Sequence, residues 1–176
     1  MKKIIVRFFV DHAKEENWIN DMAEQGWHLQ KFSSFVFVFE KGEPGSYIYR
    51  NEMVLARKND YLAFLETMDI ERVHHFAIWY YFRKKKADGP FEIYTDPTDK
   101  IRYLAKLNRV FMVGCLANLF AVIMNGVNLF QSNDYVIPIL FVIVFNFLVA
   151  VLCSVAIRKN TIRKKKLKEN QLVFES

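Results

Sequence analysis

The chain has 176 residues, of which 52% are hydrophobic and 25% charged, and its formal net charge is +6. Residues 1–97 carry 14 Lys or Arg against 15 Asp or Glu, so the basic excess lies in residues 98–109 and 158–176, on either side of an apolar block. A protein that binds nucleic acid more often carries its basic residues on the folded domain, so this distribution argues against a nucleic-acid partner. The two cysteines, Cys115 and Cys153, both lie in the apolar block, which excludes a disulfide framework in the N-terminal region.

Residues 1–97 have the pattern of a soluble α+β domain. Asp11 is a suitable N-cap for a helix over residues 12–25, and Asn59 or Asp60 for a second helix, because apolar residues then recur on one helical face. β-branched and aromatic segments bounded by turn residues predict strands over residues 4–10, 27–33, 35–40, 47–55, 72–83 and 91–94.

The order of these elements repeats at an offset of about 43 residues. The segment FVFVFEKG (35–42) aligns with IWYYFRKK (78–85), and YIYRNE (47–52) resembles EIYTDP (92–97). We therefore predict an antiparallel sheet with two helices on one face, built as two fused βαββ units or in a ferredoxin-like arrangement.

Aromatic residues are abundant, with 17 Phe, 8 Tyr and 3 Trp. Trp79 and Tyr81 alternate with their neighbours and share one face of the predicted strand 72–83. If both helices cover the other face, these two side chains form an exposed surface that is suited to binding. The competing interpretation is that aromatic residues pack in the core on one face and contact lipid headgroups or a second copy on the other.

No arrangement of residues points to catalysis. The chain has no glycine-rich phosphate loop, no zinc-type Cys/His spacing and no nucleophile motif. His74 and His75 are adjacent in a predicted strand and point to opposite faces, so they cannot form a simple metal pair. We predict a protein that is not an enzyme and that carries no metal or cofactor.

The apolar block predicts a transmembrane hairpin. Residues 110–130 and 136–157 are free of charge, and about 20 apolar residues in a helix span a hydrocarbon core of roughly 30 Å. A short connector makes the two helices antiparallel neighbours. Asp96 is a good N-cap with Pro97 at the first helical position, so a connecting helix is predicted over residues 98–109 that continues into the first span.

Basic residues flank the two spans on one side only, and the connector has none. The positive-inside rule therefore predicts a membrane protein with both chain ends, and the basic tail 158–176, in the cytoplasm. The same tail should attract anionic lipids. The residues that set this topology are Lys100, Arg102, Lys106, Arg109, Arg158, Lys159, Arg163, Lys164, Lys165 and Lys166, followed by Lys168.

Small and amide residues within the spans are predicted to pack the hairpin together. Gly114, Asn118 and Asn125 lie on one side of the first helix, and Asn146 lies at a similar depth to Asn118 on the second. We expect Asn118 and Asn146 to hydrogen-bond across the hairpin. A conduction path is the alternative, but no charge within the spans supports it.

Three segments carry a resemblance to a known family. The stretch DHAKEENWINDMAEQGWHL (11–29), the run WYYFRK (79–84) and EIYTDPTDKIRYL (92–104) are similar to the family catalogued as domain of unknown function 2812. The resemblance implies a membrane protein of Gram-positive bacteria, often encoded beside a PadR-like regulator, and it implies no activity. Family members tend to carry a second Gly-Trp pair after the second helix, where this chain has Asp69-Ile70.

Two functional hypotheses follow from the sequence. The first is a membrane-tethered binding or regulatory protein, whose cytoplasmic domain binds a ligand, a protein partner or another copy of the chain. The second is an accessory subunit of a membrane transporter, in which the amide-bearing hairpin contacts the other subunits.

Overall fold

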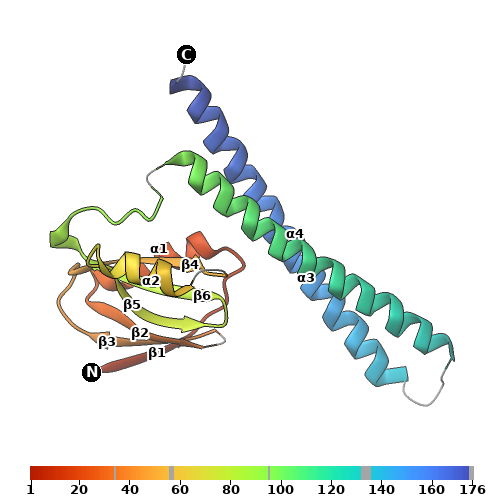
Figure 1. Ribbon diagram of the computed structural model, residues 1–176. Helices are drawn as coiled ribbons and strands as arrows, with labels where there is room; N and C mark the ends of the chain where they lie inside the picture. The colour runs from red at the N-terminus through yellow and green to blue at the C-terminus, as the bar shows by residue number, and fades with distance from the viewer. Residues whose placement is uncertain (34, 56–57, 95, 132–135, 175–176) are drawn as a thin grey trace. The chain divides into compact units, whose positions relative to one another are not determined.

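The computed structural model describes residues 1–33, 35–55, 58–94, 96–131 and 136–174. The chain divides into two compact units, Met1–Ile93 and Tyr94–Ser176, which are described separately (Figure 1). The first unit is α+β, and the second consists of two long helices.

The described residues of the first unit form six strands, two α-helices and one short 3-10 helix. In chain order they are β1 (Lys2–Val6), α1 (His12–Glu24), β2 (Trp27–Ser33), β3 (Val36–Lys41), β4 (Tyr47–Met53), α2 (Lys58–Glu66), β5 (Glu71–Phe76), β6 (Trp79–Lys85) and η1 (Lys86–Asp88). The strands form two antiparallel three-stranded sheets, sheet A with the order β1-β3-β2 and sheet B with the order β4-β6-β5 (Figure 1). The predicted α+β class is confirmed. The ferredoxin-like arrangement is not, because the described strands belong to two separate sheets.

The two sheets repeat one βαββ pattern. In each half, the first strand pairs with the third, and the second and third form a hairpin. The aligned segments 35–42 and 78–85 lie on β3 and β6, which are equivalent strands. The strand predicted over residues 47–55 was expected to be the last strand of the first repeat. It corresponds to β4, which pairs with β6 and is therefore the first strand of the second half. Residues 91–94, predicted as its counterpart, do not form a strand.

The predicted strand 72–83 is in fact the hairpin β5–β6. The chain reverses between Phe76 and Trp79, where Ala77 has a φ of 52°. This backbone region usually selects Gly, Asn or Asp. Because the turn has none of these residues, the sequence pattern did not predict it.

The ends of the helices follow ordinary capping chemistry. The Asp11 carboxylate accepts hydrogen bonds from the backbone N–H groups of Ala13 (3.1 Å) and Lys14 (3.4 Å), which confirms the predicted N-cap of α1. After α1, Gly26 adopts a φ of +79°, and a Cβ there would lie 2.8 Å from the carbonyl oxygen of Gly42. Asp69 occupies the equivalent place after α2 with a φ of 56°. The two halves therefore both have a residue with a positive φ after their helix, but in the second half this residue is not glycine.

Two hydrophobic cores hold the first unit together, and they lie on opposite faces of sheet B. The first core joins α1 to inward-facing residues of both sheets, and the second packs α2 against the other face of sheet B. Along β6, Tyr81 belongs to the first core, whereas Tyr80 and Phe82 belong to the second. The expectation that both helices cover one sheet face is therefore wrong.

The second unit is an antiparallel pair of long helices, α3 (Pro97–Gln131) and α4 (Val136–Phe174). Asp96 Oδ1 accepts a hydrogen bond of 2.7 Å from the N–H of Thr98, so the chain starts α3 as predicted. Both helices are long and apolar enough to cross a membrane. Each helix also continues beyond its apolar span into the neighbouring basic segment. Residues 97–109 alone add about 20 Å of helix, at about 1.5 Å per residue, outside the predicted span.

Candidate functional site

The predicted aromatic surface is at most partly open to solvent. Tyr81 is 3% exposed and lies in the first core, where its hydroxyl donates a 2.5 Å hydrogen bond to Glu15 of α1. Trp79 is half-buried, and its ring lies 6.1 Å from that of His12. The prediction of an exposed Tyr81 was wrong because α1 covers the face of β6 that was taken to be uncovered.

A polar cluster surrounds Tyr81. Burial raises the pKa of the Glu15 carboxyl above its usual value, although hydrogen bonds from Tyr81 and Asn51 oppose the shift. Burial also raises the pKa of the Tyr81 hydroxyl. The phenol therefore remains protonated and donates to Glu15. This cluster fixes α1 on sheet B and offers no exposed reactive group.

The outer edge of β4 is capped by side chains of α1. The Asn20 amide donates to the carbonyl oxygen of Tyr49 (3.0 Å) and accepts from its N–H (2.8 Å), as a neighbouring strand would. The Glu16 carboxylate accepts from the N–H of Asn51 (3.0 Å), and its second oxygen pairs with Arg50 (3.3 Å). These contacts block the edge against pairing with another strand.

The edge of β1 shows no such cap among the described residues. Arg7 N–H bonds to the carbonyl oxygen of Phe35 (2.8 Å) and the Met1 carbonyl oxygen accepts from Lys41 N–H (2.9 Å), so the odd-numbered residues face β3. The backbone groups of the even-numbered residues, Ile4 among them, point toward the free edge. Strand β1 thus presents an open edge, in contrast to β4.

The outward side of the β1–β3 pair is also uncovered. Ile4 lies opposite Val38 and Val6 opposite Val36, so these four β-branched side chains share one face, which we call the open face. Ile4 is 68% and Val6 75% exposed. Exposed apolar patches of soluble proteins are a common feature of interaction sites, so the open face is a candidate interaction surface.

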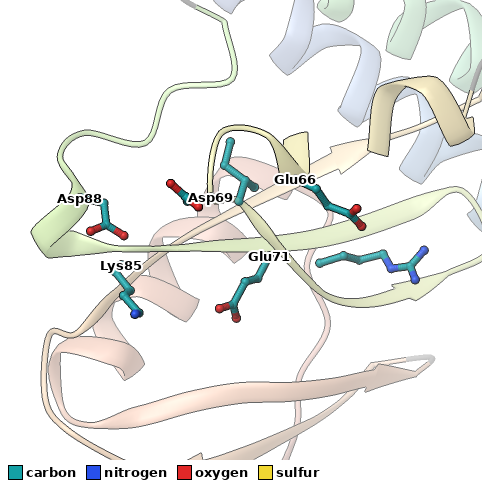
Figure 2. A pocket seen from close by; sticks show the side chains of 7 residues that line it. Glu66, Asp69, Glu71, Lys85 and Asp88 are labelled. Carbon is teal, nitrogen blue, oxygen red and sulfur yellow. The ribbon is translucent and has the colours of Figure 1, made fainter. Parts of the chain in front are cut away.

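A polar cleft of about 510 Å³ lies at the end of α2, and we call it the acidic cleft. Figure 2 shows the carboxylates around it: Glu66 from α2, Asp69 from the turn that follows, Glu71 from β5 and Asp88 from η1. Arg72 and Lys85 also line it, together with Ile70. Glu71 is held by Arg83 at 2.7 Å, and the side chains of Glu66, Asp69 and Asp88 are exposed to solvent.

Of the four histidines, His28 has a structural role. His28 is buried, and its Nε2 lies 2.7 Å from the carbonyl oxygen of Glu43 and 3.3 Å from Ser46 Oγ, which holds the turn before β4. His75 stacks on Tyr80. Burial lowers the pKa of His74. Within the described ranges, no three His, Cys, Asp or Glu side chains are grouped so that they could hold a metal ion.

The three asparagines that were predicted to pack the hairpin bond within their own helices. The Asn118, Asn125 and Asn146 amides each donate to the carbonyl oxygen four residues earlier, at 2.7, 2.7 and 2.8 Å. The expected hydrogen bond between Asn118 and Asn146 is not among the contacts of these side chains. A local carbonyl oxygen is within reach of any helical amide side chain, so it competes with a partner on another helix.

Small residues make the contact between α3 and α4. A Cβ at Gly114 would lie 3.7 Å from Cys153 Sγ, so this predicted packing residue lies at the helix contact. Cys115 Sγ lies 3.6 Å from Ser154 Oγ and 3.7 Å from the carbonyl oxygen of Ala150. Sequence reasoning missed Cys115, Ser154 and Ala150, although small residues at spacings of one helical turn are the usual signal of such a contact.

The helix contact continues into the basic flanks. Asn108 Nδ2 donates to Thr161 Oγ1, and Gln171 Nε2 donates to Thr98 Oγ1, both at 3.1 Å. The residues predicted to set the topology lie on these paired segments of α3 and α4. Lys100, Arg102, Lys106 and Arg109 lie on α3, and the basic residues of 158–168 lie on α4. The basic residues therefore lie on helical segments at one end of the hairpin.

Comparison with known proteins identifies one family. The model of the family described as "Protein of unknown function (DUF2812)" matches residues 11–116, which is more than half of the chain. No curated protein and no solved structure matches the chain.

Proposed function

The chain belongs to the DUF2812 family of proteins of unknown function, and we propose that it is a membrane-tethered, non-enzymatic binding protein. Its two apolar helices anchor it in the cell membrane, with both chain ends in the cytoplasm. The α+β unit binds a soluble partner there. The observation that carries the proposal is the acidic cleft, a polar hollow in a unit whose aromatic residues are largely used in its cores.

The cleft favours a cationic partner. Four carboxylates line it against two cationic side chains, and Glu71 is already paired with Arg83. Glu66, Asp69 and Asp88 thus supply the charge that is free to attract an incoming Lys or Arg side chain, which would form charge-assisted hydrogen bonds with them. We expect the partner to be a basic protein segment or a small cationic ligand.

The anchoring part of the proposal rests on hydropathy and flanking charge. The spans in α3 and α4 have mean hydropathies of 2.0 and 3.0. The basic residues lie at the end of the hairpin that leads to the α+β unit and to the C-terminus. By the positive-inside rule, both of these parts lie in the cytoplasm.

Neutralising the cleft tests the binding role. The variant Glu66→Gln/Asp69→Asn/Asp88→Asn removes three exposed carboxylates without changing side-chain size. Asp21→Asn, which removes one exposed carboxylate from α1, is the matched control. Cross-linking followed by purification from native membranes and mass spectrometry should recover partners that are lost from the triple variant and kept by the control.

The identity of the cross-linked residues adds a second condition. The proposal expects links between the cleft and Lys- or Arg-rich segments of a partner, weakened by added salt. Recovery of the same partners by the wild type and the triple variant would contradict the binding site.

The accessory-subunit hypothesis rests on the amide side chains of the spans alone. Each of Asn118, Asn125 and Asn146 already donates to its own helix, which uses one of its two N–H groups. Replacing all three with Leu should leave membrane insertion intact. If a co-purifying membrane complex then dissociated, the accessory-subunit hypothesis would replace the binding-protein proposal.

A further inference from the structure

The open face has aromatic residues at one end. Beyond the last pair of the β1–β3 ladder, Val6 and Val36, the rings of Phe8 and Phe35 meet edge to face at 5.1 Å. These rings are 53% and 49% exposed. Together with Ile4, Val6, Val36 and Val38, they extend an apolar surface that no described part of the first unit covers.

Basic side chains border this surface. Lys2 lies opposite Glu40 and Lys31 opposite Val38, which places both lysines on the side of the open face, and both are exposed. The side chains of Lys3 and Arg7 lie on the other face of β1, over the rings of Trp27 and of Phe9 and Trp18. Glu40 shares the open face with Lys2, so the two lysines exceed it by one positive charge.

We propose that the open face docks on the anionic headgroup surface of the bilayer that the second unit spans. Exposed aliphatic and aromatic side chains bordered by the two lysines match the interfacial layer of a membrane, where apolar groups are buried and basic groups attract acidic lipids. The inference rests on the membrane anchoring of the proposed function, and it goes beyond that proposal because it concerns a different surface from the acidic cleft.

The tether keeps a bilayer within reach of the open face. The first unit ends at Ile93 and α3 begins at Pro97, so few residues separate them. With at most about 3.5 Å per extended residue and about 20 Å of helix between Pro97 and the predicted span, the α+β unit remains near the lipid surface. This confinement raises the effective concentration of the lipid surface around the open face, which makes a weak contact sufficient for docking.

A second copy of the chain fits this surface less well. On β4, the edge is capped by Asn20 and Glu16 of α1. The positions 43 residues later, on α2, are Ala63 and Asn59. Because Ala63 has no hydrogen-bonding group, α2 of another copy could not cap β1 as α1 caps β4. Pairing of two β1 edges would leave the apolar side chains of the open face uncovered.

Lipid quenching in nanodiscs tests the docking directly. The full chain with Cys115→Ala and Cys153→Ala carries one added cysteine, either Val6→Cys on the open face or Phe64→Cys on α2, where the native side chain is 57% exposed. A bimane label on that cysteine is measured in phosphatidylcholine nanodiscs with or without phosphatidylglycerol, and in each with a nitroxide-bearing lipid as quencher. We expect quenching of the Val6 label in the phosphatidylglycerol nanodiscs, and little at the Phe64 label in either lipid.

Charge removal sharpens the test. Lys2→Gln with Lys31→Gln should lower the ratio of docked to undocked protein roughly 30-fold, at about 1 kcal/mol for each basic residue near an anionic surface. The inference is overturned if the Val6 label is quenched no more than the Phe64 label, or equally with and without phosphatidylglycerol. It is also overturned if an Ile4→Cys variant forms disulfide-linked dimers in high yield, because a second copy would then cover β1. The cleft variants test the proposed function separately, since they leave the open face unchanged.

Discussion

The two βαββ halves of the first unit have the same strand order but bury their third strands differently. In the second half, both faces of β6 are covered, one by α1 and the other by α2. In the first half, β3 is covered only on the face of Phe37 and Phe39, and its other face is open. One helix therefore serves two sheets, and sheet A is left with a face that has no helix of its own.

The comparison shows how a duplicated unit leaves one face of a sheet without a covering helix. Helix α1 packs against the apolar face of β6, and its side chains also hydrogen-bond to the backbone edge of β4. No described element does the same for β1 and the outer face of β3. The open face is not buried in either hydrophobic core, so it is available for contact with another molecule or surface.

The largest contrast should appear at equivalent positions of the third strands. Tyr81 and Val38 are 43 residues apart, and only Tyr81 is buried. Tyr81→Ala should lower the free energy of unfolding by about 3–5 kcal/mol, as for large aromatic residues in a core. Val38→Ala should cost less than about 1 kcal/mol, since the site is only half-buried. Chemical unfolding of the detergent-solubilised chain, followed by tryptophan fluorescence, measures both; equal losses would contradict the difference between the halves.

The capped edge of β4 should contribute the next largest effect. Asn20→Ala removes both hydrogen bonds to Tyr49 and leaves two backbone groups of a buried residue without them. We expect a loss of about 2–3 kcal/mol in the same unfolding measurement, because each unsatisfied buried group costs about 1–3 kcal/mol. Asp21→Ala on the same helix is the control, and it should stay within about 0.5 kcal/mol of the wild type. A loss for Asn20→Ala as small as that of the control would show that the cap has no energetic role.

The residues that end α1 and α2 offer a smaller comparison. Asp69→Gly should stabilise the first unit by up to about 1 kcal/mol, since glycine adopts a positive φ without steric cost. Gly26→Ala should destabilise it by at least about 1 kcal/mol, because the position has a φ of +79° and a Cβ would approach the Gly42 carbonyl oxygen. Shifts of the same sign in the melting temperature would contradict this account.

Replacing Glu15 should give the smallest effect, and one that depends on pH. Burial is the chief cause that raises the folded-state pKa of Glu15 above its ordinary value of 4.5. The folded state therefore binds more protons than the unfolded state in the pH window from 4.5 up to the raised pKa, and stability falls as pH increases through this window. Glu15→Gln removes this pH dependence while keeping an acceptor for the Tyr81 hydroxyl. The variant should be more stable than the wild type near neutral pH, and this advantage should shrink below about pH 4.5; an advantage that is independent of pH would contradict the assigned cause.

The local elements of the first unit could be largely predicted from its sequence. Asp11 and Gly26 mark the ends of α1 through side-chain and backbone preferences that need no tertiary information, and the bounds of β2 were predicted as observed. The turn at Ala77 was missed because its residues carry no turn preference. Phe91 was placed in a strand on composition, yet it is a buried residue outside regular structure.

The candidate sites were harder to predict, for a reason that is physical. Alternation shows that Trp79 and Tyr81 share a face, but it does not show which element covers that face. The covering of β6 depends on α1 of the other half, a long-range contact with no signature in the strand itself. The acidic cleft likewise brings Asp88 of η1 close to Glu66 and Asp69 at the end of α2, and this meeting depends on tertiary structure.

The central claim is that the hairpin anchors this chain in the membrane with the α+β unit inside the cell. Labelling of single cysteines with a membrane-impermeant maleimide in intact and lysed cells tests it most directly. The cysteines are Asp21→Cys on α1 and Lys168→Cys on α4, in a Cys115→Ala/Cys153→Ala background. The account predicts a membrane-bound chain with both cysteines protected in intact cells and labelled after lysis. Labelling of either cysteine in intact cells, or a chain found in solution without detergent, would contradict it.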